Sequence, residues 1–354
     1  MRLQLTVLLA LTGAVSAETI DEPGASGGLH VYADDDHVIV VSPSAAVRAD
    51  VAPRLSVSAD TTVDVVSAAS VDVVTSASPR TVHEQRVELG LASTYRVGRA
   101  SWWTLGIRGS HEHDYDALRV RASGKAELAQ RNTTLQLDYV FGYDDVTSVV
   151  DPTFHRDRTS HELMLGASQL LSPRGVVDII ADVTHAAGYH ASPYRQILVD
   201  LPASPLGMRL DEVTPVRRTS LAIAVRARYA LGVRWTMSAT YRFYFDTWSV
   251  SSHTVTGELS RRVGEWLVGG TLRGYLQSDS AFYSPRYVGE PRYRTHDRTL
   301  GAMRTMYGAL TLDRQLASWH LVMSAGLLRL TFHEFPQQAD RNAILTFSSL
   351  GRTW

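Results

Sequence analysis

The sequence predicts an all-β protein, a single closed antiparallel transmembrane β-barrel of 16 strands. Three observations predict this fold. Apolar and polar residues alternate along most of the chain, as on a strand whose two faces meet different surroundings. The alternating segments are about 10 to 15 residues long, which suits a tilted membrane-spanning strand, whereas strands average about five or six residues. Long connections follow only every second segment.

Residues 234–246 illustrate the alternation. Trp235, Met237 and Tyr241 share one parity, and Thr240 lies on the other. The same separation recurs in residues 116–128, 133–143 and 264–277. Glycines and β-branched residues fall in the middle of these segments, and apolar residues do not recur at helical spacing, so the pattern disfavours helices.

The alternation predicts strands at 28–34, 37–49, 53–66, 82–97, 101–111, 115–128, 133–145, 158–171, 175–189, 216–230, 233–246, 248–261, 264–278, 299–314, 317–333 and 342–354. Long loops follow odd-numbered strands, at 67–81, 146–157, 190–215, 279–298 and 334–341. Bacterial outer-membrane barrels have short periplasmic turns, long outer loops and an even number of strands. The pattern therefore predicts a bacterial outer-membrane location. Fourteen strands is the alternative, because Pro43 cannot donate a ladder hydrogen bond in the second segment.

The N-terminus resembles an export signal. Arg2 precedes an apolar run from Leu3 to Val15, and the small residues up to Ala17 form a cleavage site before Glu18. We expect a signal peptide at 1–17, a periplasmic N-terminal segment at 18–27 and the barrel at 28–354. No later segment has the roughly 18 consecutive apolar residues of a transmembrane helix.

Composition narrows the function. The 354 residues carry 35 basic and 36 acidic side chains, a net charge of -1, so no bulk charge points to nucleic acid. The chain has no cysteine, which excludes disulfides, thiolate metal sites, iron–sulfur clusters and cysteine nucleophiles. We expect no cofactor.

Seven tryptophans fall near predicted strand ends, as in the aromatic girdles of membrane barrels. They are Trp102, Trp103, Trp235, Trp248, Trp266, Trp319 and Trp354.

The parity opposite the apolar face carries many charges, which we expect to line the lumen. The candidate pore-lining residues are Arg119, Arg121, Asp138, Glu162, Asp178, Asp182, Arg226, Arg228, Arg242, Glu258 and Arg273. Arg304 and Arg329 are assigned to the same inner face. Two interpretations remain open: a polar pore with an arginine-rich wall facing an acidic one, or a salt-bridged interior that only stiffens the wall.

The sequence offers weak candidates for other chemistry. His111, His113 and Asp114 could share a divalent ion, but they lie in a predicted outer turn, where solvated charges are usual, so we expect no metal site. Ser160 with His161, and Ser252 with His253, cannot act as nucleophile and base, because neighbours in a strand point to opposite faces. We therefore expect no enzymatic activity.

Several stretches carry a family resemblance. They are DVVSAASVDVV at 64–74, SASP at 76–79, YRFY at 241–244, WSVSSHTV at 248–255 and AFY at 281–283. In this order along nearly the whole chain, they resemble the uncharacterised outer-membrane proteins of domain of unknown function 3570. The resemblance implies an outer-membrane barrel and no established activity.

The sequence thus predicts a pore for small polar solutes with a leaning toward anions. Its expected partners are outer-membrane lipid, the solutes and a possible periplasmic protein. The alternative function is a non-conducting barrel that anchors a periplasmic or surface partner.

Overall fold

The chain forms one closed antiparallel barrel of 16 strands. The computed structural model describes residues 22–68, 82–201, 204–335 and 340–354. Around the barrel the order is β1-β19-β18-β17-β15-β14-β13-β12-β9-β8-β7-β6-β5-β4-β3-β2. The first strand pairs with the last, from Gly24 opposite Thr353 to Asp34 opposite Ala343, so the sheet has no free edge. The prediction of 16 strands, not 14, is confirmed.

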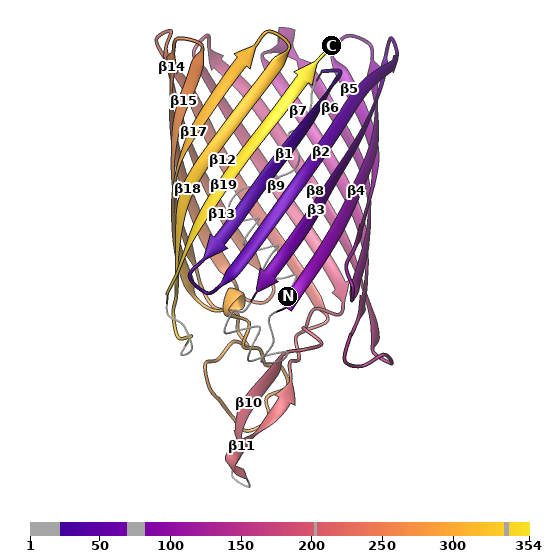
Figure 1. The fold of residues 1–354 in the computed structure, drawn as a ribbon, viewed down its shortest axis with the longest axis vertical. Coiled ribbons are helices and arrows are strands. Elements are labelled where there is room, and N and C mark those ends of the chain that lie inside the picture. Colours follow the sequence, from indigo (N-terminus) through magenta and orange to yellow (C-terminus); the bar gives the residue numbers. More distant parts are fainter. Residues whose placement is uncertain (1–21, 69–81, 202–203, 336–339) are drawn as a thin grey trace.

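The strands lean strongly in the barrel wall (Figure 1). Their bounds in the first half are β1 Gly24–Asp34, β2 Val38–Ala52, β3 Leu55–Ala68, β4 Val82–Val97, β5 Ser101–His111, β6 Tyr115–Leu128, β7 Thr133–Thr147 and β8 His155–Ser172. In the second half they are β9 Gly175–Gly188, β12 Arg217–Leu231, β13 Trp235–Asp246, β14 Ser251–Val263, β15 Trp266–Gln277, β17 Met303–Leu316, β18 Trp319–Phe332 and β19 Asp340–Thr353. Short 3-10 turns lie at η1 Ala129–Arg131 and η2 Arg298–Leu300.

Tight turns gather at one end of the barrel, the upper end in Figure 1. Gly232 and Gly264 allow two of them, because their φ angles of 75° and 62° are in the left-handed region. Trp354 donates its backbone N–H to the carbonyl of Pro23 at this end. Short turns mark the periplasmic side of such barrels, so the opposite end, with the long loops, is the outer end.

The two faces of each strand differ as predicted. On β13 the side chains of Tyr241 and Phe245 are 46% and 45% exposed, whereas Ser238 and Asp246 are buried. The exposed parity faces outward, where lipid covers it, and the buried parity faces the lumen. A closed barrel with an apolar exterior belongs in the outer membrane, because each strand pairs with two neighbours and the wall has no open edge. Among the described residues, no helix is long and apolar enough to cross a membrane.

The barrel wall begins earlier in the chain than predicted. Strand β1 begins at Gly24, so the wall starts before residue 28. Pro43 lies inside β2 but does not end it: pairing with β3 stops after Val41 and resumes at Ser44 in the same register. The signal segment at 1–17 lies outside the described residues.

Two predicted loops contain strands of their own. Strands β10 Gln196–Leu201, β11 Ser204–Asp211 and β16 Tyr287–Val288 form a separate sheet, and β10 and β11 project beyond the outer end of the barrel (Figure 1). Arg195 connects this sheet to the loop that follows β16, because it pairs with Glu212 at 2.9 Å and with Asp297 at 3.2 Å. Burial raises the pKa of Asp297, but Arg195 and the bonds from Thr299 outweigh it, so the pKa is lowered.

The tryptophan girdle is only partly as predicted. Trp248 is buried at the outer end, where its Nε1–H donates to the carbonyl of Arg217 and Arg218 lies over its ring. Trp102 shares the lumen parity with Lys125, whose Nζ is 5.6 Å from its ring centre. These two therefore belong to the interior. Trp103, Trp235 and Trp319 are exposed on the outer surface, as expected for a girdle.

Candidate functional site: the charged lumen wall

All eleven predicted pore-lining residues lie on the lumen parity. Leu118 and Val120, which flank Arg119 in sequence, are exposed on the outside, so Arg119 points inward. Exposed neighbours place the other ten in the same way, namely Val120 beside Arg121, Leu137 and Tyr139 beside Asp138, Leu163 beside Glu162, Ile179 beside Asp178, Val183 beside Asp182, Val225 beside Arg226, Tyr229 beside Arg228, Tyr241 beside Arg242, Leu259 beside Glu258 and Leu272 beside Arg273.

Acidic and basic residues of this set lie side by side. The Arg121 Nε donates to Asp138 at 2.8 Å. Asp178 accepts from Arg226 at 2.8 Å and lies 3.2 Å from an Arg228 nitrogen. Strand β9, which carries Asp178, pairs directly with β12, which carries both arginines. The expected arrangement, with this acidic wall facing the arginine wall, is wrong for these residues because the strands are neighbours.

Two arginines of the set differ from the rest. None of the described carboxylates forms an ion pair with Arg242 on β13 or Arg273 on β15. The Arg242 guanidinium lies 5.7 Å from the ring centre of Tyr244. The Nε of Arg273 is buried without a hydrogen-bond partner, and Tyr307 is its cross-strand neighbour. Neither guanidinium is therefore held in a direct ion pair within the described wall, although Arg242 interacts electrostatically with Asp182 on β9.

The wall opposite β13 carries an acidic cluster. From β13 to β3 the closed order runs through β12, β9, β8, β7, β6, β5 and β4, half of the circumference. On β3 to β5, Arg108 pairs with Asp60 at 2.8 Å and with Glu88 at 2.5 Å, and Arg86 lies 3.4 Å from Asp64. Glu84 adds a further carboxylate on the same parity of β4. This cluster was not predicted from the sequence, although the polar parity of residues 53–66 and 82–97 already carries its carboxylates.

The remaining acidic residues among the predicted pore-lining residues form fewer contacts. Glu258 accepts a hydrogen bond from the Ser238 hydroxyl at 2.5 Å across the β13–β14 ladder. Glu162 on β8 and Asp182 on β9 lie on adjacent strands, where Asp182 is the cross-strand partner of Met164.

Accessibility divides the lumen along its length. The side chains of Arg121, Arg226 and Arg228 are 51%, 42% and 46% exposed although they point inward. Nearer the outer loops the lumen parity is closed: Asp144 is fully buried between Arg119 and Arg158. Space therefore surrounds these three arginines, whereas side chains occupy the lumen nearer the outer loops around Asp144.

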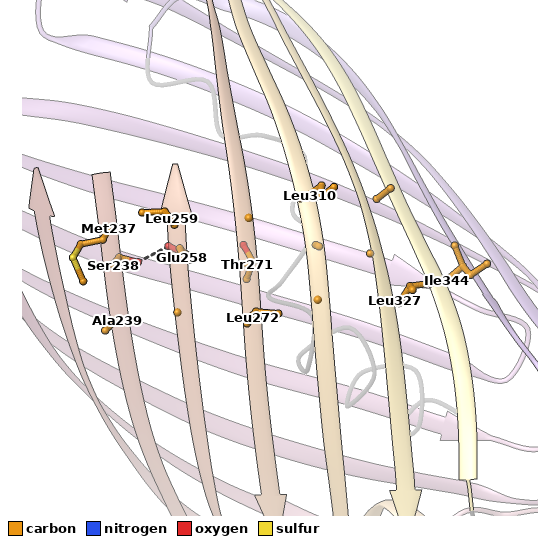
Figure 2. Close-up of a pocket in the computed structure, with 16 residues that line it drawn as sticks. Met237, Ser238, Ala239, Glu258, Leu259, Thr271, Leu272, Leu310, Leu327 and Ile344 are labelled. Atoms are coloured by element: carbon orange, nitrogen blue, oxygen red, sulfur yellow. Dashed lines mark hydrogen bonds between the residues drawn. The ribbon is translucent and has the colours of Figure 1, made fainter. Parts of the chain in front are cut away.

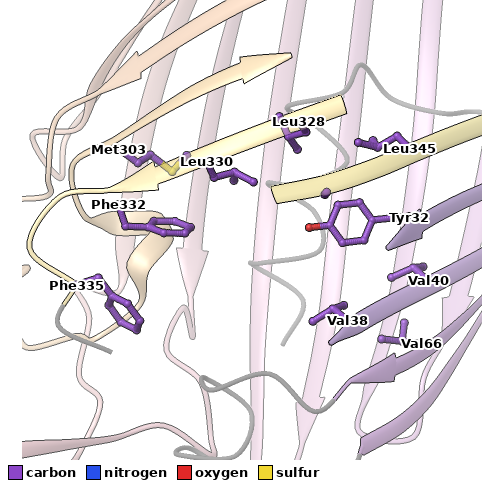
Figure 3. Packing of buried hydrophobic residues seen from close by; sticks show 11 residues of the cluster. Tyr32, Val38, Val40, Val66, Met303, Leu328, Leu330, Phe332, Phe335 and Leu345 are labelled. Atoms are coloured by element: carbon purple, nitrogen blue, oxygen red, sulfur yellow. The ribbon is translucent and has the colours of Figure 1, made fainter. Parts of the chain in front are cut away.

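An apolar cluster also fills part of the lumen nearer the outer loops (Figure 3). It packs buried side chains from β1, β2, β3, β17, β18, β19 and the loop after β18, namely Tyr32, Val38, Val40, Val66, Met303, Leu328, Leu330, Phe332, Phe335, Ala343 and Leu345. At the outer end of β17 and β18 the inward parity carries Met303 and Leu328, so Arg304 and Arg329 lie on the outward parity. The inward assignment of Arg304 and Arg329 is therefore wrong: both are exposed outside, and Arg329 pairs with Asp340 at 2.9 Å.

The candidate metal ligands do not come together. His111 faces outward and its Nδ1 lies 2.6 Å from Asp116, whereas Asp114 accepts from the Tyr194 hydroxyl of the loop after β9. Burial and this hydrogen bond raise the pKa of Tyr194 to about 12. Across the described ranges, no group of three or more potential ligands could hold a metal ion.

The serine–histidine neighbours are separated by the wall. Ser252 is buried on the lumen side, whereas His253 bonds the Tyr241 hydroxyl on the outside at 2.7 Å. Ser160 and His161 are divided in the same way, and His161 bonds the hydroxyl of Tyr139.

A buried histidine at the outer end predicts acid sensitivity. Burial, reinforced by Arg158, lowers the pKa of His190 to about 4, and its ring packs edge-on against Trp248. Since the folded pKa is below the unfolded value, this stabilisation is complete above about pH 6.5 and is lost as the pH falls toward 4. We expect the free energy of unfolding to drop by on the order of 2 kcal/mol by pH 5.

Urea unfolding in detergent at pH 7 and pH 5 measures this drop. His190→Phe keeps an aromatic ring against Trp248 without a titrating group, so its pH dependence should be flatter. Equal slopes for the two proteins would show that His190 does not cause the acid sensitivity.

The family model described as protein of unknown function DUF3570 matches residues 36–154 and 150–327. The chain belongs to this family. The match covers most of the wall of this DUF3570 barrel and confirms the resemblance seen in the sequence. No curated protein matches the chain.

Solved structures show the same fold at low identity. The DUF3570 barrel is similar to the siderophore receptor PirA from Pseudomonas aeruginosa, with 9% identity and a TM-score of 0.50 over 94% of this chain and 62% of the receptor. It is similar to a bacterial polysaccharide outer-membrane secretin, with 8% identity and a TM-score of 0.54 over 95% of this chain and 100% of the other. CdiB from Acinetobacter baumannii gives 9% identity and 0.54 over 95% and 60%. The chain thus spans less than two thirds of PirA, and these likenesses concern the outer-membrane barrel fold alone.

Proposed function

We propose that this DUF3570 barrel is a passive pore for small polar solutes and that it favours anions. The supporting observation is the set of lumen arginines that are accessible or form no direct ion pair. Arg121, Arg226 and Arg228 are about half exposed inside the lumen, and Arg242 and Arg273 form no direct ion pair with a carboxylate of the described wall. We propose no catalytic role.

The electrostatic argument rests on position. Arg242 and Arg273 lie across the lumen from the carboxylates of β3 and β4, so a field runs across the passage at their height. A charge-lined constriction selects ions by such fields. Because the carboxylates opposite are bonded to Arg86 and Arg108, the unpaired arginines attract solute anions more strongly than the acidic wall attracts cations.

Reversal potentials in planar bilayers test the proposal. Under a KCl gradient the wild-type barrel should conduct with anion preference. The double variant Arg242→Glu with Arg273→Glu should move the reversal potential toward cation preference, because it places two carboxylates where two guanidinium groups were.

A matched control changes the same formal charge away from the lumen. Arg174→Glu with Arg234→Glu alters two exposed arginines in the tight turns and should leave the reversal potential unchanged. An unchanged potential in a conducting lumen variant would remove Arg242 and Arg273 from the permeation path.

A specific observation supports a second candidate, a non-conducting scaffold. The outer half of the lumen is filled by the apolar cluster and by buried ion pairs such as Arg158 with Asp144. A barrel closed in this way would hold a periplasmic or surface partner. Absence of conductance in both the wild-type and the variant barrels would favour this scaffold over the pore.

A further inference from the structure

Three arginines at the tight-turn end face the membrane and each covers a tryptophan. Arg261 lies over Trp235 at 5.0 Å from the ring centre, Arg314 over Trp266 at 5.1 Å and Arg352 over Trp319 at 5.4 Å. Each arginine is the direct cross-strand partner of its tryptophan. Outward arginines at this height lie at the periplasmic interface, where lipid headgroups reach them.

The three arginines differ in their charge balance. Arg314 pairs with Glu265. None of the carboxylates in the described ranges forms an ion pair with Arg261 or Arg352, and both are exposed. Two of the three rim arginines thus offer an uncompensated positive charge to the lipid phase.

A hollow in the lipid-facing surface is lined by Met237, Leu259 and Leu310 among others (Figure 2), and of the three arginines Arg261 is the nearest to it along its own strand. The groove has a volume of about 960 Å³ and crosses β13, β14, β15, β17, β18 and β19. Met237 and Leu259 are cross-strand partners in the β13–β14 ladder. They are the next pair on the lipid-facing side after Trp235 and Arg261, two residues along each strand. That next pair is only about 7 Å away along the strands.

The groove leads from the rim into the membrane. On β14 it starts two residues from Arg261, at Leu259, whereas on β19 it ends at Ile344, eight residues before Arg352. The groove is open to the lipid phase, and glycines lie on its floor: a Cβ at Gly257 would meet no heavy atom within 4 Å. An apolar channel that descends from an interfacial cation matches the shape of a lipid, with a charged headgroup and apolar chains.

We propose that this groove binds an anionic phospholipid of the periplasmic leaflet, with its phosphate on Arg261 and an acyl chain along the groove. Charge complementarity selects the headgroup, because the rim at the groove carries a free guanidinium. The tight-turn end selects the leaflet, since it is the periplasmic side of the wall. A volume of this size is within the usual range of about 300 to 1,000 Å³ for ligand pockets.

Native mass spectrometry of the detergent-purified full chain tests the proposal. Phosphatidylglycerol, phosphatidylcholine and lipid A are added separately. The wild-type barrel should retain one phosphatidylglycerol about fivefold more strongly than phosphatidylcholine, and Arg261→Gln should abolish that preference. Gly257→Leu, which fills the groove without a clash at Cβ, should weaken the binding of both phospholipids.

The matched control is Arg352→Gln, which removes another exposed, tryptophan-stacked arginine that lies farther from the groove. It should retain phosphatidylglycerol as the wild type does. Equal loss in Arg261→Gln and Arg352→Gln would indicate a general cationic belt and overturn the site. Equal or stronger retention of lipid A would assign the groove to the outer leaflet and also overturn it. Persistent retention in Gly257→Leu, with folding verified by the gel shift on heating, would exclude the groove.

Discussion

Replacing Arg341 by methionine is expected to destabilise the barrel by about 3 to 5 kcal/mol, because it breaks a buried ion cluster at the seam between the first and last strands. Arg341 lies 3.2 Å from Asp34 and also pairs with Asp36. Arg298, from the loop before β17, reaches Asp36 at 3.1 Å. The variant therefore leaves two carboxylates in a buried site with a single guanidinium.

Urea unfolding in detergent, followed by tryptophan fluorescence, measures the change in the free energy of unfolding. Arg329→Met is the matched control on the neighbouring strand. Its arginine also pairs with an aspartate, but the side chains are 62% and 41% exposed, so the loss should be below about 1 kcal/mol. Equal losses in the two variants would show that the buried cluster contributes no more than a surface pair.

The alternation predicted the barrel because membrane barrels impose one rule on every strand. Lipid contacts one face, so Leu118 and Val120 on β6 identify that face wherever the lumen is polar. The rule failed on β17 and β18, where Met303 and Leu328 face an apolar part of the lumen. Parity alone does not distinguish a lipid-facing leucine from one packed inside, because both are apolar.

The ion-pair partners in the lumen were harder to predict than the face of the strand on which each side chain lies. The partners Asp178 and Arg226 are 48 positions apart in sequence, and they meet because the β9–β12 register places their Cα atoms opposite each other. A loop that contains β10 and β11 separates the two strands, so the sequence gives no measure of that register. The acidic cluster on β3 to β5 follows the same parity rule, so it could have been predicted from the sequence.

The outer sheet depends on contacts that no local pattern reveals. Strand β16 contains only Tyr287 and Val288, too short for an alternation, and its parallel pairing with Val199 and Asp200 is non-local. Trp248 misled for a related reason: its position in the β13–β14 turn suggested an interfacial ring, but the chain folds it under Arg218.

Arginine in place of Tyr241 is expected to prevent insertion of much of the protein, because Tyr241 is outward near the middle of β13. A charge on the lipid face at mid-depth costs about 2 to 4 kcal/mol. Tyr241→Phe separates this cost from the loss of the hydrogen bond to His253, and it should insert normally. The folded fraction in outer membranes is read from the mobility of unheated samples on gels.

Thr240→Arg makes the same change one residue earlier and should be tolerated. Thr240 points into the lumen, where its cross-strand neighbour Arg226 is already paired with Asp178 and is 42% exposed. The accessible space around Arg226 lets a new guanidinium remain hydrated. Glu258 lies two residues from the cross-strand partner of Thr240 on the same lumen face, where it can accept a hydrogen bond from that guanidinium. The two substituted positions lie at nearly the same depth in the membrane but on opposite faces of β13. A difference in insertion therefore reports the cost of placing arginine against lipid. Equal insertion of the two proteins would mean that the register of β13, or its exposure to lipid, is wrong.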